Sequence, residues 1–127
     1  MKIYILSYLN PEYDIITSIL ASNDKMKLEK YIDDNILHYI EEDMFESGKF
    51  PNEVYDRINK TENELYQFIT IIDNEDGINS PKHRKIIEEF DEKIENIRKE
   101  EFAKITITKR MMDDTRGLFH ISEIEYI

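Results

Sequence analysis

Apolar and polar positions follow distinct patterns along this chain, and the patterns predict most of its secondary structure. The segment 2–9 is apolar, β-branched or aromatic on both faces, which predicts a strand that is central in a sheet or covered on both sides. A turn signal follows at 10–12, and the segment 14–20 predicts a second strand. The short connection between the two strands predicts an antiparallel hairpin.

A long helix is expected next. Apolar residues recur at intervals of three and four from Leu28 to Met44, which predicts a helix that ends near Glu46. Ser22 is the expected N-cap of this helix. Gly48 is placed to end it, because glycine adopts the left-handed conformation that many helix C-termini require.

Two further helices are predicted in the middle of the chain. Helical spacing over 54–72 favours a second helix, although 66–72 is rich enough in β-branched residues to form a strand. The segment 73–77 predicts a loop, and the Ser-Pro pair at 80–81 is typical of an N-cap followed by proline at the first helical position. A heptad-like apolar stripe over 83–101 predicts a third helix that packs on the second.

The last part of the chain predicts a second hairpin. Strict alternation over 104–109 predicts a strand, 113–117 a turn, and 118–126 the final strand. We therefore expect one α+β domain over 1–127, with a four-stranded antiparallel sheet in the order ββαααββ and helices packed on one face. The segment of about 47–102 is expected to be a helical insertion into this domain.

Both ends of the chain resemble a known group of proteins. The segment 1–8, a short hairpin, Leu-Ala-Ser at 20–22 and a helix with Tyr-Ile at 31–32 resemble small uncharacterised α+β proteins common in phages and low-GC bacteria. Their last strand resembles 119–126. The resemblance covers under half of the chain and departs at Met26, where the group has a small residue. It implies a fold and an origin, and no site residue.

Composition indicates an origin for the chain and argues against several classes of function. The chain has 22 Ile and 1 Val, which indicates AT-rich coding and fits a low-GC bacterium or its phage. The net charge of −11 argues against direct binding to nucleic acid or to an anionic membrane. Cysteine is absent, no apolar run is long enough to span a membrane, and the start is too short for a signal peptide, so we expect a cytoplasmic protein.

No motif of catalysis or metal binding stands out. His38 lies at helical spacing from Glu41 and Glu42, but no HExxH pattern is present. The segment 73–77 lacks the register of a calcium loop, and three glycines cannot build a phosphate loop. We expect no catalytic residue, no cofactor, no metal and no enzymatic activity.

An acidic helix face and tyrosines outside the apolar stripes are the predicted contact surface for a partner. A solvated acidic surface is the alternative interpretation. The function expected from this surface is that of a non-enzymatic phage-encoded inhibitor, of the anti-CRISPR or another anti-defence kind, acting in the host-cell cytoplasm. Its partner is a basic, nucleic-acid-binding host protein. The predicted contact residues are Glu41, Glu42, Asp43, Glu46, Tyr55 and Tyr66.

A basic cluster supports a second hypothesis. Basic residues in the first turn of the third helix oppose the helix dipole, and with the free N–H groups they form an anion site. The corresponding function is that of a small-ligand or nucleotide-binding protein that sequesters its ligand. Pairing of these basic residues with Glu88, Glu89 and other acidic residues of the chain is the structural alternative. The residues are Lys82, Arg84 and Lys85, joined by Lys109, Arg110 and Arg116 if these lie near. A homo-oligomer formed through the outer strand of the sheet is a further possibility.

Overall fold

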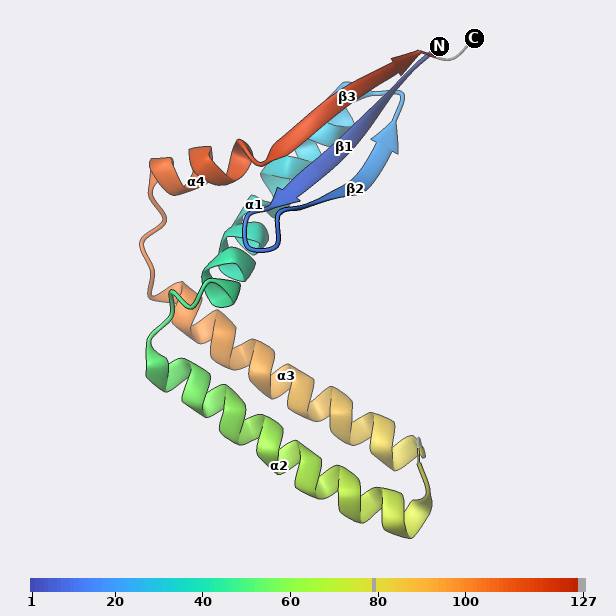
Figure 1. The fold of residues 1–127 in the computed structure, drawn as a ribbon, viewed down its shortest axis with the longest axis vertical. Coiled ribbons are helices and arrows are strands. Elements are labelled where there is room, and N and C mark those ends of the chain that lie inside the picture. Colours follow the sequence, from blue (N-terminus) through green and yellow to red (C-terminus); the bar gives the residue numbers. More distant parts are fainter. Residues whose placement is uncertain (79, 126–127) are drawn as a thin grey trace. The chain divides into compact units, whose positions relative to one another are not determined.

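The chain divides into two compact units in the computed structural model, which describes residues 1–78 and 80–125 (Figure 1). The sheet unit comprises Met1–Lys49 and the chain from Thr106 onward. The hairpin unit comprises Phe50–Ile105. Its limits lie close to those of the helical insertion expected from the sequence.

The sheet unit contains a three-stranded antiparallel sheet in the order β2-β1-β3. Strand β1 (Lys2–Asn10) is central, as one of the two sequence alternatives predicted. It pairs with β2 (Ile15–Ser22) through a tight turn and with β3 (Phe119–Glu125) from the other end of the chain. The predicted end of the last strand, residue 126, lies outside the described residues.

The prediction of four strands is wrong. The segment 104–109 alternates in sequence, but its residues connect the two units and pair with no strand among the described residues. Thr108 instead caps a short helix, α4 (Lys109–Arg116), by accepting a hydrogen bond from the Met111 N–H at 3.2 Å. An alternation over six residues was outweighed by this cap and by the helix formers that follow it.

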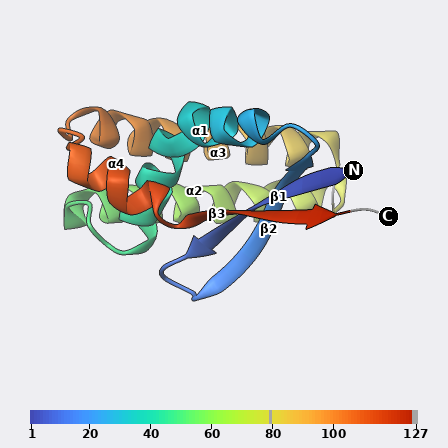
Figure 2. The same ribbon diagram turned by 90° about the horizontal axis from the view of Figure 1, so that it is seen from above.

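Helix α1 (Lys25–Glu46) packs on one face of the sheet (Figure 2). Its buried residues recur every four positions, so they form one stripe along the helix. They are Leu28, Ile32, Ile36 and Ile40. Leu6 of β1 lies at the centre of the core with no exposed area, against Leu28 and Ile32.

The ends of α1 follow the sequence only in part. The predicted N-cap Ser22 is wrong: the cap is Asp24, whose carboxylate accepts from the Met26 N–H at 3.0 Å. The Ser22 hydroxyl accepts from the Asp24 N–H at 3.1 Å and so supports the true cap. Gly48 has a φ of +72° just after the helix, as expected for a residue that ends it.

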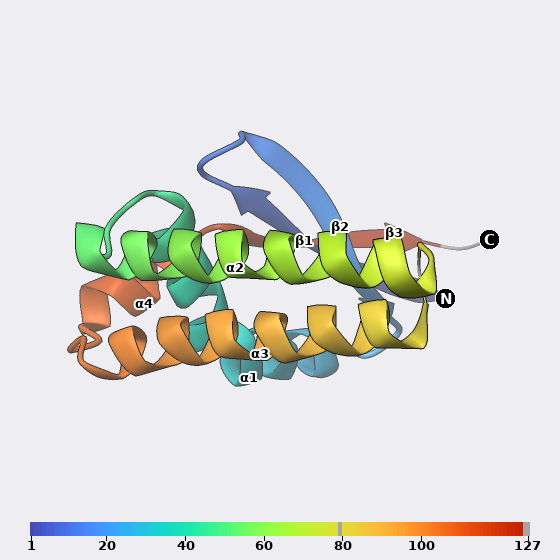
Figure 3. The ribbon, with the colours of Figure 1, turned by 90° about the horizontal axis from the view of Figure 1, so that it is seen from below.

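The hairpin unit consists of two long antiparallel helices, α2 (Asn52–Asp76) and α3 (Pro81–Ala103), that lie side by side (Figure 3). The helical interpretation of 66–72 is confirmed, and so is the N-cap Ser80, which accepts from the N–H of the third residue of α3 at 3.2 Å. The loop predicted over 73–77 is wrong as far as Asp76, because α2 continues to that residue.

One interaction near the connection between α2 and α3 accounts for this longer helix. The imidazole Nδ1 of His83 donates to the Asp73 carboxylate at 2.6 Å, and both side chains are largely buried. The pair fixes the last turn of α2 against the first turn of α3. No helix in the described parts of the chain is long and apolar enough to cross a membrane.

Candidate binding site between α1 and α4

The last turns of α1 concentrate negative charge. Glu41, Glu42 and Asp43 are half-buried there, and Glu46 is exposed. The C-terminal end of a helix carries a partial negative charge, and no basic residue in the last turn of α1 offsets it. The acidic side chains and the helix dipole therefore add up at this end.

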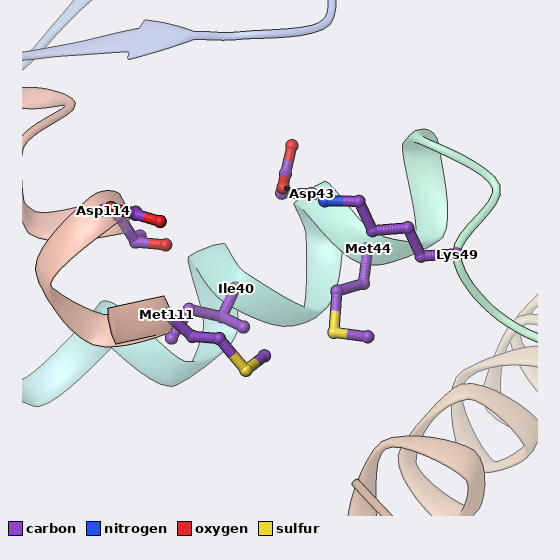
Figure 4. A pocket seen from close by; sticks show the side chains of 7 residues that line it. Ile40, Asp43, Met44, Lys49, Met111 and Asp114 are labelled. Atoms are coloured by element: carbon purple, nitrogen blue, oxygen red, sulfur yellow. Dashed lines mark ion pairs between the residues drawn. The ribbon is translucent and has the colours of Figure 1, made fainter. Parts of the chain in front are cut away.

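Helix α4 closes one side of this region. It packs against α1 and is fixed by an ion pair in which Arg116 Nη1 donates to Asp33 at 2.6 Å. A cavity of about 140 Å³ lies between the two helices (Figure 4). Its lining residues are Ile40, Asp43, Met44, Lys49, Met111, Asp114 and Thr115.

The cavity combines apolar walls with carboxylates. Figure 4 shows Ile40 and Met111 beside each other, while Asp43 of α1 and Asp114 of α4 bring one carboxylate from each helix. The Lys49 ammonium lies 3.8 Å from Asp43 Oδ2. Carboxylates accept strong hydrogen bonds from ammonium and guanidinium groups, and thioether and branched side chains pack against methylene stems.

The size of the cavity limits what it can hold. Small-molecule pockets usually enclose roughly 300–1,000 Å³. At about 140 Å³ this cavity suits the end of one side chain rather than a nucleotide. Its chemistry and its volume both fit a single Lys or Arg side chain.

An aromatic cluster borders the acidic end of α1. The rings of Tyr8, Tyr39 and Phe119 lie with centroids 4.6 to 5.0 Å apart. Burial raises the pKa of the Tyr8 phenol to about 12, and the charges of Asp43 and Glu46 add to this effect. Burial also raises the pKa of Tyr39, followed by the hydrogen bond between its hydroxyl and that of Tyr31. These phenols stay neutral beside the carboxylates.

The six contact residues predicted from sequence fall in both units. Glu41, Glu42, Asp43 and Glu46 gather on α1 in the sheet unit. Tyr55 and Tyr66 belong to α2 in the hairpin unit, where Tyr66 is exposed and the Tyr55 hydroxyl accepts from the Phe50 N–H at 3.4 Å. Only the four acidic residues therefore lie together on one helix.

The six predicted anion-binding residues also divide. Lys82, Arg84 and Lys85 lie on the first turns of α3, whereas Lys109, Arg110 and Arg116 lie on α4. Three of the six make an ion pair with an acidic neighbour: Lys82 with Asp76, Arg110 with Asp114, and Arg116 with Asp33.

The structural alternative for the cluster on α3, pairing with acidic neighbours, holds for Lys82 with Asp76, whereas pairing with Glu88 or Glu89 is not found among the described residues. Arg84 and Lys85 instead line a shallow, open hollow of about 290 Å³ together with Pro81 and Glu88.

No metal-binding cluster is present in the parts of the chain that the structure describes. No group of three or more His, Asp or Glu side chains there is arranged to hold an ion. His38 Nε2 lies 3.2 Å from a Glu42 carboxylate oxygen in an exposed pair along α1.

Of the seven residues that line the cavity, only Asp43 is among the contact residues predicted from the sequence. Asp114 and Met111 come from α4, which was predicted to be strand and turn. The available signal was Thr108, a good N-cap three residues before Met111. Long-range packing of α4 on α1 leaves no such signal in the sequence.

Comparisons with known proteins give no relative. No family model, no curated protein and no solved structure matches the chain.

Proposed function

We propose that this chain is a non-enzymatic interaction protein that binds a basic protein partner, one of whose Lys or Arg side chains enters the cavity between α1 and α4. The observation that carries the proposal is the pair of carboxylates, Asp43 and Asp114, on an apolar-walled cavity of side-chain size. A cationic head with an aliphatic stem complements both parts of this lining.

The chain's own lysine supports the choice of a cation. Lys49 follows α1, and its ammonium already lies 3.8 Å from the Asp43 carboxylate. Its side chain is largely exposed, so it is held loosely and can swing away. An incoming ammonium or guanidinium would take its place beside Asp43.

The class of partner follows from the surrounding charge. Asp43 and Asp114 line the cavity. Glu41, Glu42 and Glu46 add negative charge in the last turns of α1, so this region attracts a surface with several Lys and Arg residues. Proteins that bind nucleic acid carry such surfaces where they meet the phosphates. A protein that covers this surface inhibits nucleic-acid binding, which is the inhibitor function predicted from the sequence.

The test uses a defined probe. Fluorescence anisotropy would measure binding of a labelled Arg-rich peptide to the full chain over a salt series. Asp43→Asn and Asp114→Asn should each weaken binding by roughly tenfold to a hundredfold, because a hydrogen bond to a charged group is worth about 1.5–3 kcal/mol. Glu12→Gln is the matched control, since it removes the same charge from an exposed turn of the same unit.

Two results would contradict the proposal. Equal weakening by Glu12→Gln would show that only net charge matters. Unchanged binding after Asp43 and Asp114 are both neutralised would remove the cavity from the interaction.

Lys49→Met should have the opposite effect and tighten peptide binding, because it frees the Asp43 carboxylate of its internal partner.

A second candidate function rests on the hollow beside Arg84 and Lys85. These cations make no ion pair among the described residues, and they lie in the first turns of α3, where the partial positive charge of the helix N-terminus also favours an anion. A thermal-shift measurement with a panel of nucleotides tests it, because a ligand of the native state raises the melting temperature. Loss of the shift in the variant Arg84→Gln/Lys85→Gln would assign the site, and no shift with any nucleotide would remove this candidate.

A further inference from the structure

The hairpin unit leaves one apolar face without cover. Phe68 and Ile71 lie one turn apart on α2 and are 51% and 54% exposed. The Phe68 ring contacts the buried Phe90 of α3 at a centroid distance of 6.0 Å. The Lys93 ammonium lies over the Phe90 ring, 4.6 Å from its centroid, and Ile86 is one turn before Phe90. These residues share one side of the hairpin.

Charged residues continue this face on both helices. On α2 they occupy heptad-like positions before and after Phe68, and on α3 they lie in a corresponding row. The row on α2 is Arg57, Glu64, Phe68, Ile71 and Glu75; the row on α3 is Lys82, Ile86, Glu89, Lys93 and Glu100. Of these ten residues only Ile86 is half-buried, and the rest are exposed.

The contacts between the helices set the register of the two rows. Phe68 lies level with Phe90, and Asp73 lies level with His83. The two helices are antiparallel, and each residue advances about 1.5 Å along its helix. A residue a given number of positions after Phe68 on α2 is therefore level, to within about one residue, with the residue the same number of positions before Phe90 on α3. By this rule the level pairs are Arg57 with Glu100, Glu64 with Lys93, Ile71 with Ile86, and Glu75 with Lys82.

This pattern is complementary to itself. A two-fold axis parallel to the helices lays α2 of one copy on α3 of a second copy at the same level. Four of the level pairs then join opposite charges or two apolar side chains, whereas Phe68 lies beside Glu89 and the remaining position of the two rows places Thr61 beside Asn96. Each helix also has antiparallel neighbours only, which is the arrangement of an up-down four-helix bundle.

We propose that the exposed face of the α2–α3 hairpin binds the same face of a second copy of this chain, with the connection between α2 and α3 of one copy beside that of the other. The second copy is the occupant because its charges match this face pair by pair. A homodimer of this kind is isologous, so each interaction occurs twice. It uses the helices rather than the sheet edge that the sequence suggested.

The oligomeric state of the full chain is the first test. Analytical ultracentrifugation should show a dimer that dissociates on dilution. Phe68→Glu/Ile71→Glu should give a monomer, whereas Gln67→Glu/Thr70→Glu, an equal change of charge at the adjacent exposed positions, should leave the dimer intact. A monomeric wild-type chain at every concentration, or a dimer that survives the double variant, overturns the proposal.

A charge exchange provides a second test, which is needed because Phe68 also contacts Phe90 and the double variant could misfold. Lys93→Glu should weaken the dimer about tenfold, because the changed pair occurs twice in the interface. Adding Glu64→Lys should restore it, since the exchanged charges again face each other. Failure of the second change to restore affinity would contradict the proposed register.

The orientation has its own measurement. The chain has no cysteine, so Ile78→Cys provides a single spin-labelling site at the connection between the helices, where Ile78 is 79% exposed. The proposed dimer places the two labels close together. A pairing of opposite orientation would separate them by about the length of α3, roughly 35 Å at 1.5 Å per residue, and that distance would overturn the proposed arrangement.

Discussion

The two units of this chain reach stability in different ways. The sheet unit encloses Leu6, Leu28 and Ile36 almost completely, between the sheet and α1. The hairpin unit has 48 helical residues in α2 and α3, and its most buried side chains in these helices are Val54, Ile58 and Phe90. A pair of helices has one narrow seam to bury, whereas a sheet and a helix enclose a core.

This difference fits the two proposed roles. A closed core holds α1 firmly on the sheet, so the carboxylates at its C-terminal end are kept in place before a partner arrives. The hairpin gains from any surface that covers Phe68 and Ile71, so a second copy adds the burial that the pair of helices lacks. The sheet unit offers a prepared site and the hairpin offers an incomplete one.

Equal truncations in the two units should give the largest contrast. Leu28→Ala removes a side chain with no exposed area and should lower the free energy of unfolding by about 2–5 kcal/mol. Leu65→Ala removes the same atoms from the half-buried seam of α2 and should cost clearly less, since less burial is lost. Urea unfolding followed by circular dichroism measures both.

The comparison would break if Leu65→Ala cost as much as Leu28→Ala. The seam of the hairpin would then be as tightly packed as the core of the sheet unit. Measuring the Leu65 variant at two protein concentrations separates the loss of seam packing from the loss of a dimer, because only the latter depends on concentration.

The sequence predicted the hairpin unit better than the sheet unit. Heptad-like spacing and the Ser-Pro pair before α3 are local signals, and both α2 and α3 appear where these signals placed them. The failure at 104–109 has a tertiary cause. A short alternating segment becomes a strand only where a neighbouring strand pairs with it, and this segment connects the units instead.

The same reasoning explains the outcome at the candidate site. Asp43 is among the predicted contact residues because acidic residues are visible in any sequence. Asp114 and Met111 acquire their role only when α4 packs against α1, a contact between segments far apart in the chain. Net charge predicts only the sign of the proposed partner, whereas packing defines the cavity.

A histidine–carboxylate pair in each unit gives a smaller contrast. His83 and Asp73 form a 2.6 Å hydrogen bond with side chains only 13% and 22% exposed, so Asp73→Asn should lower the free energy of unfolding by about 1–3 kcal/mol. His38 and Glu42 lie 3.2 Å apart with side chains 61% and 45% exposed, so Glu42→Gln should cost about 0–1 kcal/mol.

Thermal unfolding of the two single variants provides the measurement for this pair of histidines. The larger effect belongs to the hairpin unit here, which is the reverse of the leucine comparison. A hairpin without a closed core depends more on each polar contact that fixes its helices. Equal effects of Asp73→Asn and Glu42→Gln would contradict this interpretation.

The smallest expected effect is a shift in the titration of one tyrosine. Tyr8 has a pKa raised from 10 to about 12, first by burial and then by Asp43, Glu46 and Glu42. The folded chain disfavours the ionised phenol, so Tyr8 contributes stability that is complete below pH 10 and is lost as the pH rises from 10 to about 12.

Ultraviolet difference titration of the wild type against Tyr8→Phe isolates this phenol from the other seven tyrosines of the chain. Neutralising Asp43 and Glu46 should lower the pKa of Tyr8 only part of the way, because burial is the larger cause and stays in place. A return to 10 would show that the acidic end of α1 dominates the local field. A basic partner bound at that end should lower the pKa in the same direction, so the titration of Tyr8 also reports whether the proposed site is occupied.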